Sequence, residues 1–301
     1  MIRPGTIDDA PAVAELLAAT YPNTWVTAAG VRTWMATTPE RARRRWWAVE
    51  RSGALVGWAT AGLNPETKEE HAAAVGAMVH PTRRQRGLGS ALWNEVEAYL
   101  QHLGARHVTV MGSDAEPSRR FLAARGFAVT FVDRTSGLDP RTLPPPPPAR
   151  EGVELLPFTG IDPRVVFELD VEAVRDVPLD QPMDDLRWDE WLERTWRYPD
   201  LDREASLVAL VDGQPAGFTT LLIAPDTLLA VSGMTGVARR YRGRGLAELI
   251  KRHALACAAA KGVTMALTDN DESNAAMLAV NDKLGYRRVA TRLVFSRRSI
   301  D

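Results

Sequence analysis

Two short basic turns carry the residues of this chain that are best suited to hold an anion. The first, RRQRGLGSAL, occupies residues 83–92, and the second, YRGRGLAELI, occupies residues 241–250. Both place arginines beside a glycine, and Gly245 follows Gly87 by 158 positions. If the chain contains two copies of one fold, each copy needs this turn; if it does not, the pairing is a chance product of an arginine-rich sequence.

Each turn is expected to join a buried strand to a helix. The apolar stretches AAAVGAMV and LLAVSGMTGV precede the two turns, and a pattern typical of an amphipathic helix follows both. The N-terminus of a helix has unpaired N–H groups and the positive end of the helix dipole, and glycine lets a ligand approach the backbone closely. Such a turn suits phosphate or pyrophosphate. Positive charge is added by Arg84, Arg86, Arg242 and Arg244.

Two common nucleotide-binding motifs are excluded by the residues present. A Walker A loop requires G-x-x-x-x-G-K-[ST], and neither turn has the lysine. A dinucleotide-binding turn requires G-x-G-x-x-G in the first strand–turn–helix unit of a domain. The sequence Gly87-Leu88-Gly89 lacks the third glycine and lies far into its half of the chain.

A second landmark supports a duplication. Gly126-Phe127 and Gly285-Tyr286 each close a predicted helix before a final strand, and they are 159 positions apart. Between the halves, five consecutive prolines at residues 144–148 favour an extended polyproline conformation that neither helix nor central strand can continue through. We therefore predict an N-terminal domain over residues 1–137, a Pro-rich linker over residues 138–152 and a C-terminal domain over residues 153–301.

Each half has the same order of predicted elements. A short strand is followed by a helix and a hairpin, then by a buried strand, the glycine turn and its helix, and last by a strand, a helix and a closing strand. The hairpin turns at residues 51–54 in the first half and at residues 212–214 in the second. This mixture of strands and helices around a sheet predicts an α/β (α+β) fold for each half.

The turns resemble the acyl-CoA loop of the GCN5-related N-acetyltransferases. The signature of that family is [RQ]-x-x-G-x-[GA] directly after the fourth strand. The first copy matches as RQRGLG at residues 84–89, after VHP in the V-x-P-x-x-R form of the family. The second matches as RGRGLA at residues 242–247, after Val237. The late RGF and LGY also match, so the resemblance covers almost all of both halves and indicates a tandem member of the family.

The resemblance implies two tandem acetyltransferase-like domains, each with a mixed, splayed central sheet flanked by helices. It implies acetyl-CoA as the acyl donor and no metal. The pantetheine arm would pair with the fourth-strand backbone at residues 77–79 and 235–237, and the pyrophosphate would accept N–H groups at residues 84–90 and 242–248. The implied CoA-binding residues of the first copy are Met78, Val79, Arg84, Gln85, Arg86, Gly87, Leu88, Gly89 and Ser90. Those of the second copy are Gly236, Val237, Arg242, Gly243, Arg244, Gly245, Leu246 and Ala247.

The family's usual acid is missing from both halves. In the family an amine attacks the thioester directly in a ternary complex, and a tyrosine four residues before the late glycine often serves as the acid for the departing sulfur. Leu122 and Asn281 occupy that position here, and neither can donate a proton as an acid. A thiol pKa of about 8.5 makes thiolate a tolerable leaving group, so transfer remains possible.

Three asparagines distinguish the second half. Asn270, Asn274 and Asn281 lie in a region that the first half fills without amides, and Asn274 and Asn281 are seven residues apart, on one face of a predicted helix. Their side chains can orient the thioester carbonyl or the pantetheine amides, which predicts a catalytic role and an active C-terminal half. Alternatively, Asn274 caps the helix and Asn281 makes a local backbone hydrogen bond. The pattern identifies no general base.

The acceptor pocket is expected in the segments that follow each first strand. In the first half this segment contains Tyr21, Trp25 and Trp34. In the second half it contains Trp188, Trp191 and Trp196, whose near-helical spacing is first of all typical of a core. Acidic residues beside these tryptophans would attract a cationic amine, such as an aminoglycoside, a polyamine or a peptide amine.

The composition limits the remaining partners. A formal net charge of −1 argues against nucleic acid. The chain has one cysteine, Cys257, no apolar stretch long enough to span a membrane, and no secretory pattern at its start. We expect a cytoplasmic monomer or homodimer without a membrane or nucleic-acid partner. Two functions stay open: an acetyl-CoA-dependent N-acetyltransferase acting on a primary amine of a small molecule or peptide, or a catalytically silent acyl-CoA-binding sensor or scaffold module.

Overall fold

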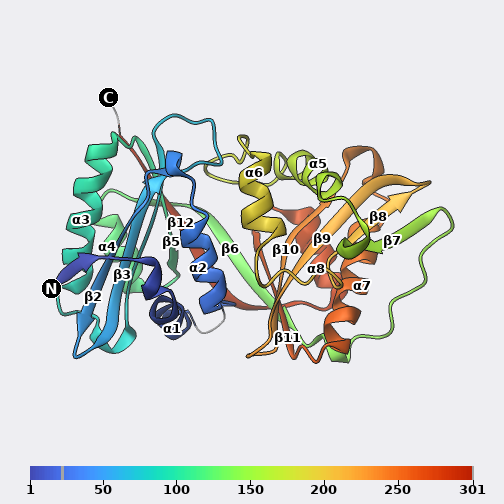
Figure 1. Cartoon of the computed structure of the whole chain (residues 1–301), viewed down its shortest axis with the longest axis horizontal. Coiled ribbons are helices and arrows are strands. Elements are labelled where there is room, and N and C mark those ends of the chain that lie inside the picture. The colour runs from blue at the N-terminus through green and yellow to red at the C-terminus, as the bar shows by residue number, and fades with distance from the viewer. Residues whose placement is uncertain (22–23, 300–301) are drawn as a thin grey trace. The chain divides into compact units, whose positions relative to one another are not determined.

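The computed structural model describes residues 1–21 and 24–299 and divides the chain into two compact units (Figure 1). Unit 1 comprises Met1–Val132, Leu179–Asp185 and Thr291–Asp301. Unit 2 comprises Asp133–Pro178 and Leu186–Ala290. Each unit therefore takes most of its residues from one half of the chain and is completed by residues from elsewhere in the sequence.

The sheet of unit 1 is mixed. Its strands follow the order β1-β2-β3-β4-β5-β12-β6, with β1 to β4 antiparallel, β4 and β5 parallel, and β5 antiparallel to β12. The bounds of these strands are β1 Ile2–Pro4, β2 Arg45–Arg51, β3 Ala54–Leu63, β4 Ala72–Val79, β5 His107–Ser113, β6 Ala128–Leu138 and β12 Arg287–Arg298.

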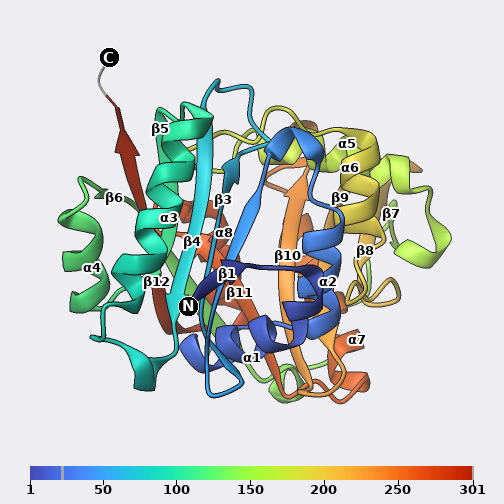
Figure 2. The same cartoon turned by 60° about the vertical axis from the view of Figure 1, so that its left-hand side comes forward.

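Helices cover both faces of this sheet (Figure 2). Ala48 of β2 packs in the core with α1 and α2, whereas its neighbours Trp47 and Val49 pack in the core with α3. This alternation follows from the period of a strand, in which successive side chains point to opposite faces. The helices are α1 Ala10–Thr20, α2 Ala28–Ala36, α3 Leu88–Leu103 and α4 Glu116–Ala123.

Unit 2 repeats this plan. The strand order is β7-β8-β9-β10-β11-β6-β12, and β10 and β11 are the parallel pair. On β8, Val208 packs in the core with α5, while Leu207 and Ala209 pack in the core with α7. The strands are β7 Val153–Pro157, β8 Leu207–Val211, β9 Gln214–Ala224, β10 Leu229–Val237 and β11 Met265–Asp271. The helices are α5 Pro163–Val174, α6 Trp188–Trp191, α7 Leu246–Ala260 and α8 Ala275–Leu284, and α6 continues as a π-helix over Leu192–Trp196.

The last strand of each half ends in the sheet of the other unit. In unit 1, residues 292–298 of β12 pair with β5, and Leu293 and Phe295 are buried in the core. In unit 2, residues 133–138 of β6 pair with β11, and Leu138 joins the core of that unit. The hydrophobic core of each unit is thus incomplete without the end of the other repeat.

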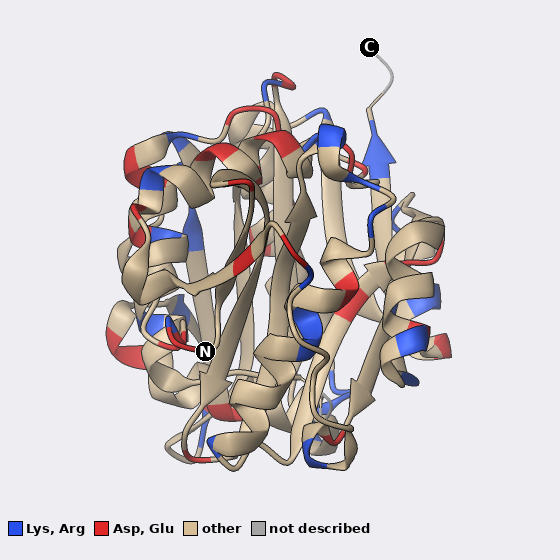
Figure 3. Ribbon diagram, turned by 90° about the vertical axis from the view of Figure 1, so that its right-hand side faces the viewer, with Lys and Arg blue, Asp and Glu red and all other residues tan. Residues whose placement is uncertain are grey.

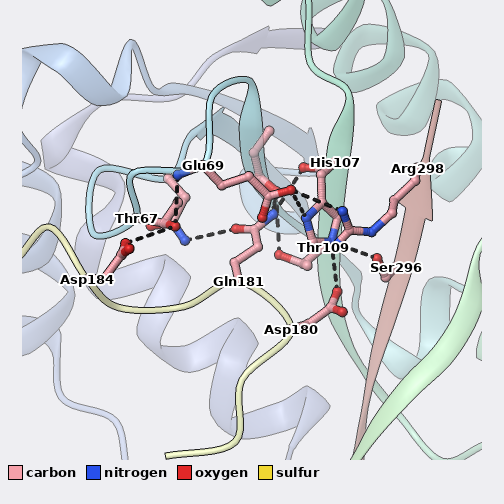
Figure 4. A network of polar contacts seen from close by, with 11 residues as sticks. Thr67, Glu69, His107, Thr109, Asp180, Gln181, Asp184, Ser296 and Arg298 are labelled. Carbon is pink, nitrogen blue, oxygen red and sulfur yellow. Dashed lines mark hydrogen bonds and ion pairs between the residues drawn. The ribbon is translucent and has the colours of Figure 1, made fainter. Parts of the chain in front are cut away.

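A polar network fixes the segment Leu179–Asp185 within unit 1 (Figure 4). At its centre is His107, which is buried at the start of β5. Its Nδ1 lies 2.9 Å from Glu69 Oε1, and its Nε2 lies 2.9 Å from Asp180 Oδ2 and 3.0 Å from Ser296 Oγ. Gln181 Nε2 donates to the His107 carbonyl at 3.0 Å. These hydrogen bonds satisfy polar groups that would otherwise be buried at a cost.

Candidate functional site

The parallel strands of unit 1 separate partway along their length. β4 and β5 are paired from Ala72 with His107 to Val75 with Val110, and the pairing ends there although β4 continues to Val79 and β5 to Ser113. The backbone of β4 beyond Val75 therefore presents an unpaired edge toward the gap. Backbone N–H and C=O groups at such an edge need partners, so the gap is suited to a ligand that carries amides.

A cleft of about 470 Å³ lies at this separation in unit 1. It is bounded by β4, the glycine turn, the start of α3, β5 and α4. Apolar side chains form much of its wall, and arginines of the turn lie at one end. The residues that line it include Met78, Val79, Arg84, Trp93, Met111 and Leu122.

The glycine turn has left-handed backbone at two positions directly before α3. Gly87 precedes α3 with φ of 78°, and Gln85 has φ of 60°. Both values lie in the left-handed region, which glycine adopts without the strain that a side chain adds. Arg84 Nε donates to the Val79 carbonyl at 3.2 Å, which ties the turn to the end of β4. The predicted residues Gln85, Gly89 and Ser90 also line the cleft, while Arg86 is exposed and Leu88 packs against the core.

Unit 2 has the same geometry at the second turn. β10 and β11 pair from Leu229 to Ser232 and then separate. Gly243 and Gly245 both have φ of 76°, and Arg242 Nε donates to the Val237 carbonyl at 2.9 Å. The predicted residues Gly236 and Val237 end β10, and Leu246 and Ala247 begin α7. The two turns are therefore alike in backbone as well as in sequence.

The charge around the two turns differs. In unit 2 the Asp176 carboxylate accepts from Arg239 and pairs with Arg242 Nη2 at 2.7 Å, and these arginines hold the pKa of Asp176 well below its usual range. In unit 1, Arg84 has no carboxylate partner among the described residues. A second cation also approaches the turn of unit 2, where Arg150 Nη1 donates to the Arg244 carbonyl at 3.1 Å.

The structure brings two of the three predicted asparagines together. Asn281 Nδ2 donates to Asn270 Oδ1 at 2.6 Å, and Asn281 Oδ1 is buried without a hydrogen-bond partner among the described residues. Asn274 instead caps α8, where its side-chain oxygen accepts from Met277 N at 3.2 Å. One N–H of the Asn281 amide is thus used within the pair, and its buried oxygen is an acceptor without a hydrogen bond. A catalytic role for these three residues stays a prediction.

A buried lysine in unit 2 was not singled out from the sequence. Lys251 of α7 has 1% of its surface exposed, and burial lowers the pKa of its ammonium to about 7. Its Nζ lies 5.3 Å from the ring centroid of Tyr286, a buried residue whose pKa burial raises to about 12. The signal available in the sequence is register: Lys251 follows Trp93 by 158 positions, the same spacing as the glycine turns.

The aromatic residues proposed for acceptor binding divide into two sets. Tyr21 lines the cleft of unit 1, and burial raises its pKa above the ordinary value against the opposing effect of Arg84 and Arg292. Trp191 and Trp196 are buried in the core of unit 2, and Trp191 Nε1 donates to Asp170 Oδ2 at 2.7 Å. These two tryptophans have the packing role that their spacing indicated.

Figure 3 shows basic and acidic segments interspersed along the elements that face the viewer. Over residues 1–21 and 24–299, no three His, Cys, Asp or Glu side chains are grouped so that they would hold a metal ion. In the same part of the chain, every helix is too short or too polar to cross a bilayer.

Comparison with known families and structures gives consistent matches. The model of the "Acetyltransferase (GNAT) family" matches residues 10–127 and again residues 167–286. A GCN5-related N-acetyltransferase from Sphaerobacter thermophilus has a TM-score of 0.73 and 22% identity, over 100% of this chain and 97% of that one. A tandem GNAT protein from the clavulanic acid biosynthesis pathway has a TM-score of 0.73 and 22% identity, over 100% of this chain and 99% of that one. No curated protein sequence matches the chain.

These matches bear on the fold and on the family separately. At 22% identity, the likeness to solved structures shows the fold alone. It confirms the predicted class, in which a mixed, splayed sheet flanked by helices occurs twice. The family model matches more than half of the chain and confirms the family that the two turns resemble.

Proposed function

Because the chain belongs to the acetyltransferase (GNAT) family, we propose that it transfers an acetyl group from acetyl-CoA to a primary amine of a small molecule or peptide. One observation carries this proposal: a parallel strand pair that separates beside an arginine–glycine turn, present once in each unit. The family match alone supports acyl transfer. The choice of an amine acceptor and of acetyl-CoA belongs to the proposal.

The backbone of each splay offers complementary groups for the donor. The unpaired edge of β4 at residues 76–79 would pair with the amides of the pantetheine arm, and the N–H groups around Gly87 would receive the pyrophosphate. Arg84, without a carboxylate partner among the described residues, adds positive charge at the same end of the cleft. In unit 2 the corresponding groups are the end of β10 and the turn at Gly245.

Acyl transfer in this scheme needs no enzyme nucleophile. The nitrogen of a neutral amine attacks the thioester carbon, a C–N bond forms, and the C–S bond breaks as CoA leaves. The protein contributes by holding the thioester in one orientation and by placing proton donors and acceptors near the reacting atoms.

We assign different tasks to the two units. The cleft of unit 1 has Trp93, Met111 and Leu122 where a donor's acyl end would lie, and these side chains offer packing and no proton. The positions in register in unit 2 hold Lys251, Asp269 and Asn281, which are polar. We propose that unit 1 binds an acyl-CoA and that unit 2 carries out transfer.

A second function is favoured by the apolar wall of unit 1. A site that binds acyl-CoA tightly without chemistry would act as a sensor or scaffold, and Leu122 in the place of an acid is the observation that supports it. The two functions differ in whether thiol is released when an amine is added.

The test combines binding stoichiometry with turnover. Calorimetry with acetyl-CoA is expected to show binding that Gly87→Glu removes in unit 1 and Gly245→Glu removes in unit 2, because a carboxylate at the turn repels the pyrophosphate and the left-handed φ strains a side chain. Thiol release with a panel of amines is expected to require Gly245 and to survive Gly87→Glu. Tight binding with no release on any amine would favour the silent module, and unchanged stoichiometry in both variants would refute the assigned sites.

A further inference from the structure

The Lys251 ammonium is an unusual group in the core of unit 2. It has 1% of its surface exposed, and the ring of Tyr286 is its one polar contact among the described residues. Burial alone accounts for the lowered pKa, with no described carboxylate or second cation contributing. An unpaired charge at such a position is costly, and proteins retain such groups mainly at functional sites.

The repeat register places Lys251 beside the splay of unit 2. In unit 1 the position in register is Trp93, which lines the cleft and packs edge-on against Phe127 at 5.5 Å between ring centroids. Lys251 instead places its Nζ over the ring of Tyr286, the residue in register with Phe127, at 5.3 Å from the ring centroid. The lysine therefore takes the place of an aromatic wall residue of the cleft while keeping that residue's partner.

Two further polar atoms of the same core have no ordinary hydrogen bond among the described residues. They are Asn281 Oδ1 and the Tyr286 hydroxyl, and Ser232 is near the latter without an ordinary hydrogen bond to it. In unit 1, Leu122 and Phe127 occupy these positions and bring no polar atom. Unit 2 thus has three buried polar residues where unit 1 has apolar ones. This indicates that unit 2 binds a ligand with charged or hydrogen-bonding groups that reach these residues.

We infer that Lys251 is the acid that protonates the departing CoA sulfur in unit 2, an inference that rests on the proposed transfer in this unit. When the C–S bond breaks, the sulfur keeps the electron pair and takes a proton from Lys251 Nζ. The amide nitrogen releases its proton to solvent, and the neutral lysine is reprotonated from solvent. The reaction balances as amine and thioester giving amide and thiol.

The acidity of the lysine matches this task. An acid works best when its pKa lies near the working pH. With a pKa of about 7 for Lys251 and about 8.5 for a thiol, the proton favours sulfur by roughly 30-fold before the attraction between ammonium and thiolate is counted. An attraction worth about 10-fold leaves a preference of about 3-fold for sulfur. An ordinary lysine, with a pKa of about 10.4, would hold its proton against the thiolate. Burial thus makes Lys251 an effective acid, and the lysine takes the role that the family's tyrosine would have at position 281.

The first test reads the ionisation of bound CoA and needs no acceptor. Thiolate absorbance of CoA bound to the full chain is recorded against pH, and the difference between the unaltered protein and Gly245→Glu isolates unit 2. Below pH 7, where Lys251 keeps its proton, we expect the bound thiol to ionise about 10-fold more readily than free CoA through the nearby ammonium, and above pH 7 this advantage should shrink as Lys251 becomes neutral. Lys251→Met is expected to abolish this shift while calorimetry still shows CoA bound, and Lys283→Met, at an exposed lysine of α8, is expected to keep it.

The second test separates charge from proton donation. Lys251→Arg is expected to keep the thiol shift, because its charge persists, but to lose turnover, because a guanidinium does not release its proton. Lys251→Met is expected to lower kcat by roughly 100-fold with little change in KM for acetyl-CoA, within the usual range for loss of an acid.

The outcomes distinguish the inference from the proposed function. A thiol shift that persists in Lys251→Met, or turnover that persists in both variants, would overturn the role of Lys251 and leave transfer in unit 2 intact. CoA binding that does not depend on Gly245 would overturn both, because no sulfur would then reach the lysine.

Discussion

Replacing Lys251 by methionine is expected to stabilise unit 2, because it removes a buried charge while keeping an unbranched side chain of similar length. The pKa of this lysine falls from its ordinary 10.5 to about 7 in the folded protein. Between these two values the unfolded chain binds a proton that the folded chain does not, so stability rises with pH over this range. Below pH 7 the lysine is protonated in both the folded and the unfolded chain, so the full cost of burying its ammonium lowers the free energy of unfolding.

The magnitude follows from the size of the shift. A change of 3.5 units from 10.5 to about 7 corresponds to about 5 kcal/mol below pH 6 and about 4 kcal/mol at pH 7, at about 1.36 kcal/mol per unit. Replacing a buried ion pair by apolar groups of similar volume often stabilises a protein by about 1–4 kcal/mol. We therefore expect Lys251→Met to raise the free energy of unfolding by about 2–4 kcal/mol at pH 7 and by less than about 1 kcal/mol at pH 10.5.

Thermal unfolding and hydrogen exchange of the α7 amides, both followed from pH 6 to pH 10.5, measure this difference. The difference in free energy of unfolding between Lys251→Met and the unaltered chain should narrow steadily as pH rises. Lys283→Met should show no such difference, because that lysine is exposed. A difference that does not change with pH, or a loss of stability in Lys251→Met at every pH, would refute the reasoning that the ammonium is buried and unpaired.

Three further changes test the units and the assignment of tasks. Phe295→Ala is expected to destabilise unit 1 by about 3–5 kcal/mol in denaturant unfolding, since the side chain is 2% exposed in that core although it belongs to the last strand of the chain. His107→Ala leaves Glu69 and Asp180 without their buried partner and should cost about 2–4 kcal/mol by the same measurement, with faster proteolysis near residue 180. Asn281→Ala should lower turnover more than Leu122→Ala does, and the opposite order would move transfer to unit 1.

The sequence predicts the repeated parts of this molecule well because they are local. The glycine turns follow from residue types that tolerate a left-handed φ, and Gly87 and Gly245 adopt it. The end of the fourth strand and the start of its helix follow from hydrophobic periodicity on either side. Two copies at constant spacing reinforce each other, which is why the family and the fold class are confirmed by the matches.

Features that depend on distant parts of the chain are beyond such a prediction. The sequences of β6 and β12 predict closing strands. No local pattern predicts that residues 133–138 pair with β11 of the second repeat, or that residues 292–298 pair with β5 of the first. Asn274 illustrates the limit for side chains: the sequence leaves a shared face with Asn281 and a helix cap as alternatives, and the structure places Asn274 at the cap of α8. The division at residues 138–152 describes the duplication and stays a prediction about domains.

The exchange of closing strands links the stability of the two units. Leu293 and Phe295 complete the core of unit 1, so a chain that ends before residue 291 exposes the apolar surface that they cover. Leu138 has the corresponding place in unit 2. Neither repeat therefore has a full core by itself, so folding of each unit needs both repeats whichever of them carries out the proposed transfer. The two units can nevertheless differ at equivalent positions of the repeat. Unit 1 has the apolar Trp93 in the wall of its cleft, and unit 2 has the buried Lys251 at the equivalent position.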